Sequence, residues 1–202
     1  QSATTMLIAC GEFFAILIAG IDLSVGSVVA LTGMLTAQMM VAGVHPFFAV
    51  LIGSIGAGAL LGAVNGALIN FTKLHPFIIT LGTQSIFRGI TMIISNAKPV
   101  FGFPRSFKTA FGGMVAGFIP MPVVVALIVA AVLWFVTTKT KTGRNIYALG
   151  GNKEAAWYSG INVKLHTLLV FIISGICAGI CGAVMIARLG SAEPMAGSGH
   201  ET

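Results

Sequence analysis

The sequence predicts an all-α protein, a polytopic bundle of transmembrane helices, on the evidence of its composition and of three charge-free stretches. The 202 residues are 56% hydrophobic and 8% charged, whereas soluble domains contain roughly 25% charged residues. No Asp, Glu, Lys or Arg occurs in 23–72, 109–138 or 165–187. Each stretch is long enough for at least one span of about 20 residues. This composition excludes a cytosolic enzyme.

Apolar runs and the turn residues between them predict six spans in a single transmembrane domain. His-Pro pairs begin two of the spans, because proline is favoured at the first helical position, where its missing N–H is not needed. Two polar segments, 96–120 and 137–164, are expected to be the long loops. The predicted spans are about 6–19, 24–44, 46–71, 76–95, 122–136 and 165–187.

Basic residues are distributed unevenly between the two long loops, and this predicts the orientation. Cytoplasmic loops carry an excess of Lys and Arg, which places 137–164 inside and explains the net charge of +6 without a nucleic-acid partner. The tight hairpins then place Asp22 and Lys73 on the cytoplasmic side and His45 outside. The basic residues counted are Lys139, Lys141, Arg144, Lys153 and Lys164 in one loop, and Lys98, Arg105 and Lys108 in the other.

Polar residues inside the spans are functional candidates, because burying them in a membrane is costly unless they find partners or water. Thr80, Gln84 and Arg88 share one helix face. This stripe is either part of a path for a hydroxyl-rich solute or a set of hydrogen bonds between helices. The other candidates are Glu12, Asn65 and Thr83.

Asp22 and Ser24 stand immediately before the second span. A carboxylate or hydroxyl at this position can accept hydrogen bonds from the free N–H groups of a helix start. Capping of the second span is therefore one interpretation of these two residues, and contact with a transported substrate is the other.

The segment 142–160 contains the strongest local signals in the chain. We expect Gly150 and Gly151 to break the chain, Asn152 to cap, and 154–159 to form one or two helical turns that end at Gly160. A short surface helix with small residues on one side fits the cleft of another protein. A solvated loop is the alternative.

Enzymatic motifs are not found in the sequence. The five carboxylates are scattered, and no phosphate-binding loop occurs. We therefore expect no catalytic residue, no metal and no cofactor here, and ATP that drives transport would be bound by another chain. The competing hypothesis is a carrier driven by an ion gradient, which would use the buried carboxylates Glu12 and Asp22.

Several motifs resemble those of ribose-type sugar permeases of ABC importers. Glu154-Ala155-Ala156, followed by Gly160, is similar to the loop through which such permeases engage their ATPase, and 20–27, 76–83 and 143–152 are similar to other signatures. The resemblance implies that the residues contacting the ATPase are Gly143, Arg144, Gly150, Gly151, Asn152, Glu154, Ala155, Ala156 and Gly160.

The resemblance also implies the setting in which the chain works. By analogy, the chain is part of a larger permease of about ten spans in a bacterial inner membrane. The partners implied are a second permease copy, a cytoplasmic ABC ATPase, a periplasmic sugar-binding protein and a monosaccharide, which crosses the bilayer by alternating access.

Overall fold

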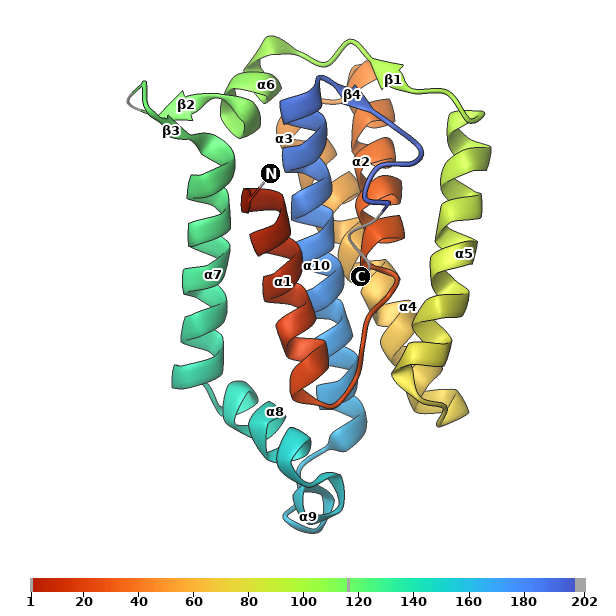
Figure 1. The fold of residues 1–202 in the computed structure, drawn as a ribbon, viewed down its shortest axis with the longest axis vertical. Helices are drawn as coiled ribbons and strands as arrows, with labels where there is room; N and C mark the ends of the chain where they lie inside the picture. The colour runs from red at the N-terminus through yellow and green to blue at the C-terminus, as the bar shows by residue number, and fades with distance from the viewer. Residues whose placement is uncertain (1, 116, 199–202) are drawn as a thin grey trace.

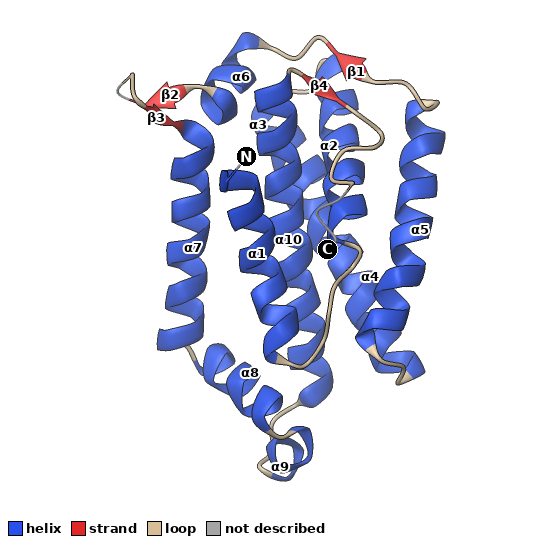
Figure 2. Ribbon diagram, viewed as in Figure 1, coloured by secondary structure: helices blue, strands red, loops and turns tan. Residues whose placement is uncertain are grey.

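The computed structural model describes residues 2–115 and 117–198 and forms a helical bundle around α10 (Val163–Leu189) (Figures 1 and 2). In these ranges four helices are long and apolar enough to cross a membrane, and two shorter apolar helices accompany them. The predicted fold class, a bundle of membrane helices, is confirmed. The shorter two are α1 (Ser2–Leu17) and α2 (Val25–Val41); the longer ones are Pro46–Thr72, α5 (Pro76–Ser95), α7 (Met121–Lys139) and α10.

The helix Pro46–Thr72 is continuous but changes its winding. It comprises α3 (Pro46–Ala49), the π-helical stretch η1 (Val50–Gly56) and α4 (Ala57–Thr72). At the π-helical stretch the hydroxyls of Thr36 and Ser54 share a hydrogen bond of 2.8 Å, which ties η1 to α2.

Both segments predicted as long loops contain further structure. The first includes β1 (Val100–Phe101), α6 (Arg105–Gly112), β2 (Met114–Val115) and β3 (Ile119–Pro120). β2 pairs with β3, and β1 pairs with β4 (Ser191–Ala192), both antiparallel. These elements lie at the end of the bundle opposite α8 (Lys141–Gly151) and α9 (Lys153–Tyr158) (Figure 1).

Gly150 and Gly151 do not break the chain where the sequence predicts. They are the last two residues of α8, and the break falls at Asn152, the C-cap of α8 and the N-cap of α9. A glycine pair is compatible with a helix when the surroundings require close approach of another backbone, as they do at Gly150.

The central helices α4 and α10 meet backbone to backbone along a glycine seam, which we define as Gly58 and Gly62 on α4 with Gly175 and Gly179 on α10. A Cβ atom on Gly62 would overlap the carbonyl oxygen of Phe171, and one on Gly58 would overlap that of Gly175. Small residues allow this approach, and van der Waals contact then holds the helices together where lipid supplies no hydrophobic force.

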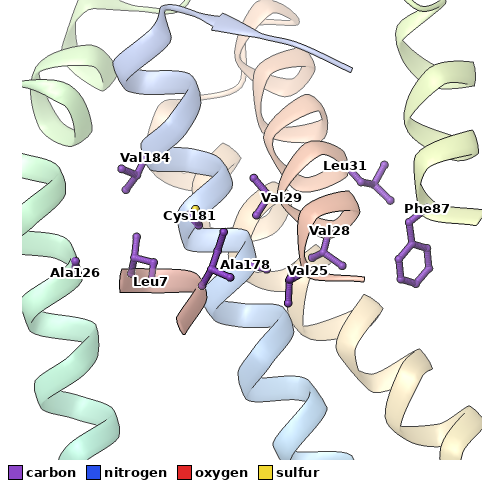
Figure 3. Close-up of a cluster of buried hydrophobic side chains, with 11 residues drawn as sticks. Leu7, Val25, Val28, Val29, Leu31, Phe87, Ala126, Ala178, Cys181 and Val184 are labelled. Carbon is purple, nitrogen blue, oxygen red and sulfur yellow. The ribbon is translucent and has the colours of Figure 1, made fainter. Parts of the chain in front are cut away.

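A buried apolar cluster joins five helices at the middle of the bundle. Figure 3 shows its side chains from α1, α2, α5, α7 and α10 meeting between the helices. Because apolar contacts of this kind are close-packed, they fix the relative positions of the helices that carry the polar residues. The labelled members are Leu7, Val25, Val28, Val29, Leu31, Phe87, Ala126, Ala178, Cys181 and Val184.

The non-helical segment 18–24 between α1 and α2, which we call the strap, departs from the predicted topology. After α1 the chain turns back and runs to the start of α2, which begins part-way along the bundle (Figure 1). Asp22 was predicted at the cytoplasmic end of a span, but it is buried within the protein. Irregular backbone at this depth is tolerated because the surrounding protein supplies its polar partners.

Candidate functional site

The strap is held by a cluster of polar side chains, which we call the polar cage: the buried Asp22, Ser24, Asn65 and Ser174 and the half-buried Glu12. Both carboxylate oxygens of Asp22 accept hydrogen bonds. Oδ1 accepts from the backbone N–H of Ser24 at 3.1 Å and from its hydroxyl at 2.6 Å, and Oδ2 accepts from the Ser174 hydroxyl at 2.7 Å. These bonds compensate the cost of burying the carboxylate.

The other members of the cage connect the strap to further helices. Asn65 Nδ2 on α4 donates to Ser24 Oγ at 2.7 Å, and Glu12 Oε1 on α1 accepts from the backbone N–H of Asp22 at 2.9 Å. Nearby, Thr80 on α5 donates to the Ile21 carbonyl at 3.0 Å. Side chains of four helices therefore fix one short segment.

Sequence reasoning placed Asn65, Thr80, Asp22 and Ser24 among the candidates but did not select Ser174. It also noted Glu12 without assigning it to the path or to the coupling element. Ser174 lies in the apolar run of α10, and its partner Asp22 is 152 residues away in the sequence. The polarity of Ser174 within an otherwise apolar span was the one sequence feature that could have indicated its role.

The capping interpretation fails for the side chain of Ser24. Ser24 is the N-cap residue of α2, but its hydroxyl accepts no bond from the first N–H groups of that helix. It donates to Asp22 instead, and Asp22 accepts from the backbone of Ser24 rather than from within α2. The pair therefore fixes the strap.

The polar stripe on α5 is divided between different partners. Thr80 and Thr83 are buried, and Gln84 and Arg88 are half-buried. Thr83 donates to the Thr80 carbonyl in its own helix. Arg88 Nη1 donates to the carbonyls of Pro194 and Ala196 at 3.2 and 2.8 Å, so it ties α5 to the segment that follows β4.

A cavity of about 600 Å³ lies beside the cage. The strap and one side of α1 line it, and its polar side chains are Thr5, Glu12 and Asp22. Its volume is in the range of small-molecule sites. Two cage residues, Glu12 and Asp22, therefore border a space that a solute could occupy.

The second candidate region is α9 at the end of the bundle. Asn152 Oδ1 accepts from the backbone N–H of Ala155 at 2.9 Å, which caps the helix as predicted. Gly160 follows with a φ of +79°, a left-handed conformation that favours glycine. Glu154 and Ala155 are exposed, but Ala156 is only 4% exposed.

The sequence predicted a surface of small residues on α9 that includes Ala156. The burial of Ala156 contradicts this prediction. Ala156 faces the rest of the protein, and the large exposed side chains of α9 are Trp157 and Tyr158, at 63% and 80% exposure. Sequence reasoning missed these aromatics because it weighted the alanines, although exposed Trp and Tyr are typical of protein interfaces.

α8 anchors α9 to the bundle through contacts with three helices. Asn145 Nδ2 and His166 Nε2 are 3.1 Å apart, which joins α8 to α10. A Cβ on Gly143 would overlap backbone oxygens at the end of α7, and one on Gly150 would overlap the carbonyl oxygen of Leu17 at the end of α1. Arg144 and Gly151 are exposed.

A larger cavity of about 1270 Å³ separates α8 and α9 from the ends of α4 and α5. Its lining includes the basic side chains of Lys73, Lys153 and Lys164 and the acidic side chain of Glu154. The cage and the α8–α9 region are thus two distinct sites, each next to its own cavity.

Comparisons with known proteins identify the family. The family model described as the branched-chain amino acid transport system permease component matches residues 1–202. The chain belongs to this permease family. It is 62% identical over its whole length to the D-allose transport system permease protein AlsC of Escherichia coli (strain K12) and covers 62% of that protein. No solved structure matches the chain.

Ribose permeases are also similar. The chain is 42% identical, over all of its length and 63% of the relative, to the ribose import permease protein RbsC of Haemophilus influenzae. It is 41% identical to RbsC of Bacillus subtilis, over all of its length and 62% of that protein. The predicted resemblance to ribose-type sugar permeases is confirmed. The chain spans a little under two thirds of the length of these relatives.

Proposed function

We propose that this chain is part of the membrane permease of a binding-protein-dependent ABC importer that carries a monosaccharide, D-allose or a ribose-like sugar, across the bacterial inner membrane. The observation that carries the proposal is the 62% identity, over the whole chain, to a D-allose permease. The apolar helices support the membrane setting. Transport proceeds by alternating access, and the chain itself performs no catalysis.

The α8–α9 region is the part of the proposed permease that engages a separate ATPase. The exposed Trp157 and Tyr158 and the capped, short α9 support this role, because they form a rigid protrusion at one end of the bundle. The excess of basic residues in 137–164 supports a cytoplasmic position for this end. The coupling residues from Gly143 to Gly160 either form this protrusion or, like Gly143, Gly150 and Ala156, hold it in place.

The solute path is proposed to pass the polar cage. In this conformation the polar side chains along the proposed path form hydrogen bonds within the protein, so they shape the wall of the path. These side chains are Asn65, Thr80, Asp22 and Ser24. The cavity beside Glu12 is the space that a sugar would occupy next to the polar cage. A second permease copy and a periplasmic sugar-binding protein complete the proposed importer.

Reconstitution tests the function. The complete permease, with its ATPase inside proteoliposomes and its binding protein outside, is supplied with a panel of radiolabelled sugars that includes D-allose, ribose and galactose. We expect uptake of one sugar that requires internal ATP and persists when ionophores collapse the ion gradients. Uptake that needs an ion gradient and ignores ATP would favour a secondary carrier and refute the proposal.

A further inference from the structure

The strap is positioned from two ends. At its beginning α1 ends at Leu17, and Ala19 takes a left-handed conformation with a φ of +56°. L side chains rarely adopt this conformation, so the surroundings must enforce it. At its other end Asp22 and Ser24 are held in the polar cage.

One glycine of α8 contacts the end of α1, immediately before the strap. A Cβ on Gly150 would overlap the carbonyl oxygen of Leu17, so α8 lies directly against the backbone at the end of α1. The neighbouring Gly151 has open space around it: apart from its chain neighbours and the backbone of its own helix, nothing lies within 4 Å of a Cβ placed there. The close contact is therefore specific to Gly150.

The strap lines both of the cavities described above. Ala19 lines both of them. On one side, Gly20, Ile21 and Asp22 line the cavity of about 600 Å³ next to the cage. On the other, Ile18 lines the cavity of about 1270 Å³ that also contacts α8 and α9. A displacement of the strap would join the two spaces.

The polar cage is incompletely satisfied in this conformation. Among the described residues, two buried side-chain acceptors have no hydrogen-bond partner, Glu12 Oε2 and Asn65 Oδ1. Buried acceptors are nearly always paired in folded proteins, and an unpaired one needs a physical explanation. A second arrangement of the strap, in which these two oxygens gain partners or meet water, supplies one.

We propose that the strap, residues 18–24, is the gate between the two cavities and that Gly150 is its positioning residue. Movement of α8 and α9 on the ATPase displaces the backbone of Leu17, the strap turns about Ala19, and the cage side chains exchange partners. The cavity beside Glu12 then opens toward the α8–α9 end. This inference rests on the proposed function, and it identifies the part of the chain through which ATP-driven movement reaches the solute path.

The test compares two glycines in the complete permease, reconstituted with its ATPase and its sugar-binding protein. Gly150→Ala forces α8 and the end of α1 apart, whereas Gly89→Ala adds the same methyl group in open space on α5, away from the coupling residues. We expect the sugar carried per ATP hydrolysed to fall about tenfold in Gly150→Ala, within the range for residues that couple distant sites. Gly89→Ala should keep the wild-type ratio. A mere loss of folded protein would lower both rates together and leave the ratio unchanged.

A second variant tests the gate without a steric clash. Ala19→Gly keeps the left-handed conformation accessible but removes the restraint on its backbone, so the ratio should again fall while the complex assembles normally. If Gly150→Ala fails to assemble, Ala19→Gly decides the matter.

The possible failures are distinguishable. Wild-type ratios of sugar to ATP in both Gly150→Ala and Ala19→Gly would overturn the gate while leaving the proposed function intact. A wild-type permease that takes up no sugar with ATP would overturn the proposed function, and the inference with it.

Discussion

The glycine seam and the strap show two different ways of holding a membrane protein together. Along the seam, α4 and α10 touch through their backbones at Gly58, Gly62, Gly175 and Gly179, and even one added carbon would overlap the opposite helix. The strap is held mainly by hydrogen bonds of buried side chains. Hydrogen bonds can exchange partners during a movement, whereas a close-packed seam transmits movement as a rigid unit. The difference assigns a fixed role to the seam and a mobile one to the strap.

Filling the seam should have the largest effect on stability. In Gly62→Ala the new methyl group would overlap the Phe171 carbonyl, and we expect a loss of about 3 kcal/mol or more, since overpacking forces backbone shifts. Gly82→Ala on α5 is the matched control, because nothing lies within 4 Å of a Cβ there. The thermal midpoint and the yield of monodisperse protein in detergent measure the difference. Equal stability of the two variants would show that the seam is not close-packed.

Removing the central carboxylate of the cage should have the next largest effect. Asp22→Ala leaves the hydroxyls of Ser24 and Ser174 without their acceptor, and we expect about 3 kcal/mol of destabilisation, because hydrogen bonds to charged groups contribute about 1.5–3 kcal/mol each. Ser174→Ala removes a single bond and should cost about half as much. Chemical unfolding in detergent measures both. If the position of the strap did not depend on the polar cage, neither variant would lose stability.

Arg88 should stabilise the segment after β4 locally rather than the whole bundle. In Arg88→Met the carbonyls of Pro194 and Ala196 lose their charged donor. We expect hydrogen exchange at Ala196 and Gly197 to accelerate by about tenfold, in line with about 1.5–3 kcal/mol for bonds to charged groups. Exchange in α10 should stay unchanged. Unaltered exchange at Ala196 and Gly197 would argue that packing alone holds this segment.

Uncapping α9 should have the smallest effect of the series. Asn152→Ala removes the acceptor for the Ala155 N–H and should destabilise the short helix by about 1 kcal/mol. Hydrogen exchange at Ala155 reports the fraying, and Asn152→Asp should restore protection because aspartate caps equally well. If the alanine variant exchanges as slowly as the wild type, the rigidity of α9 has another source.

The sequence predicted the elements that depend on local signals. α5 occupies Pro76–Ser95, the predicted bounds, because a His-Pro pair fixes its start. The cap at Asn152 and the turn at Gly160 were likewise readable from nearby residues. The path and coupling roles assigned to individual residues remain predictions that the experiments above address.

The features that the sequence analysis missed depend on contacts between distant residues. The burial of Asp22 depends on Ser174, and the partners of Arg88 lie more than a hundred residues further along the chain. The sequence predicted a break at Gly150 and Gly151, but both lie within α8. Gly150 is required by its close contact with the Leu17 carbonyl oxygen, and this contact between distant residues is not visible in the sequence. The burial of Ala156 follows from how α8 and α9 dock, which helical periodicity alone does not fix.

The side of the membrane on which α9 lies is the strictest test of its engagement with a cytoplasmic ATPase. Ala155→Cys places a thiol on the exposed surface of α9, in a chain whose native cysteines, Cys10, Cys177 and Cys181, are replaced by alanine. A membrane-impermeant maleimide is applied to sealed right-side-out and inside-out vesicles. We predict labelling in inside-out vesicles alone, and protection when the ATPase is added. Labelling from the outer face would contradict the proposed engagement of a cytoplasmic ATPase.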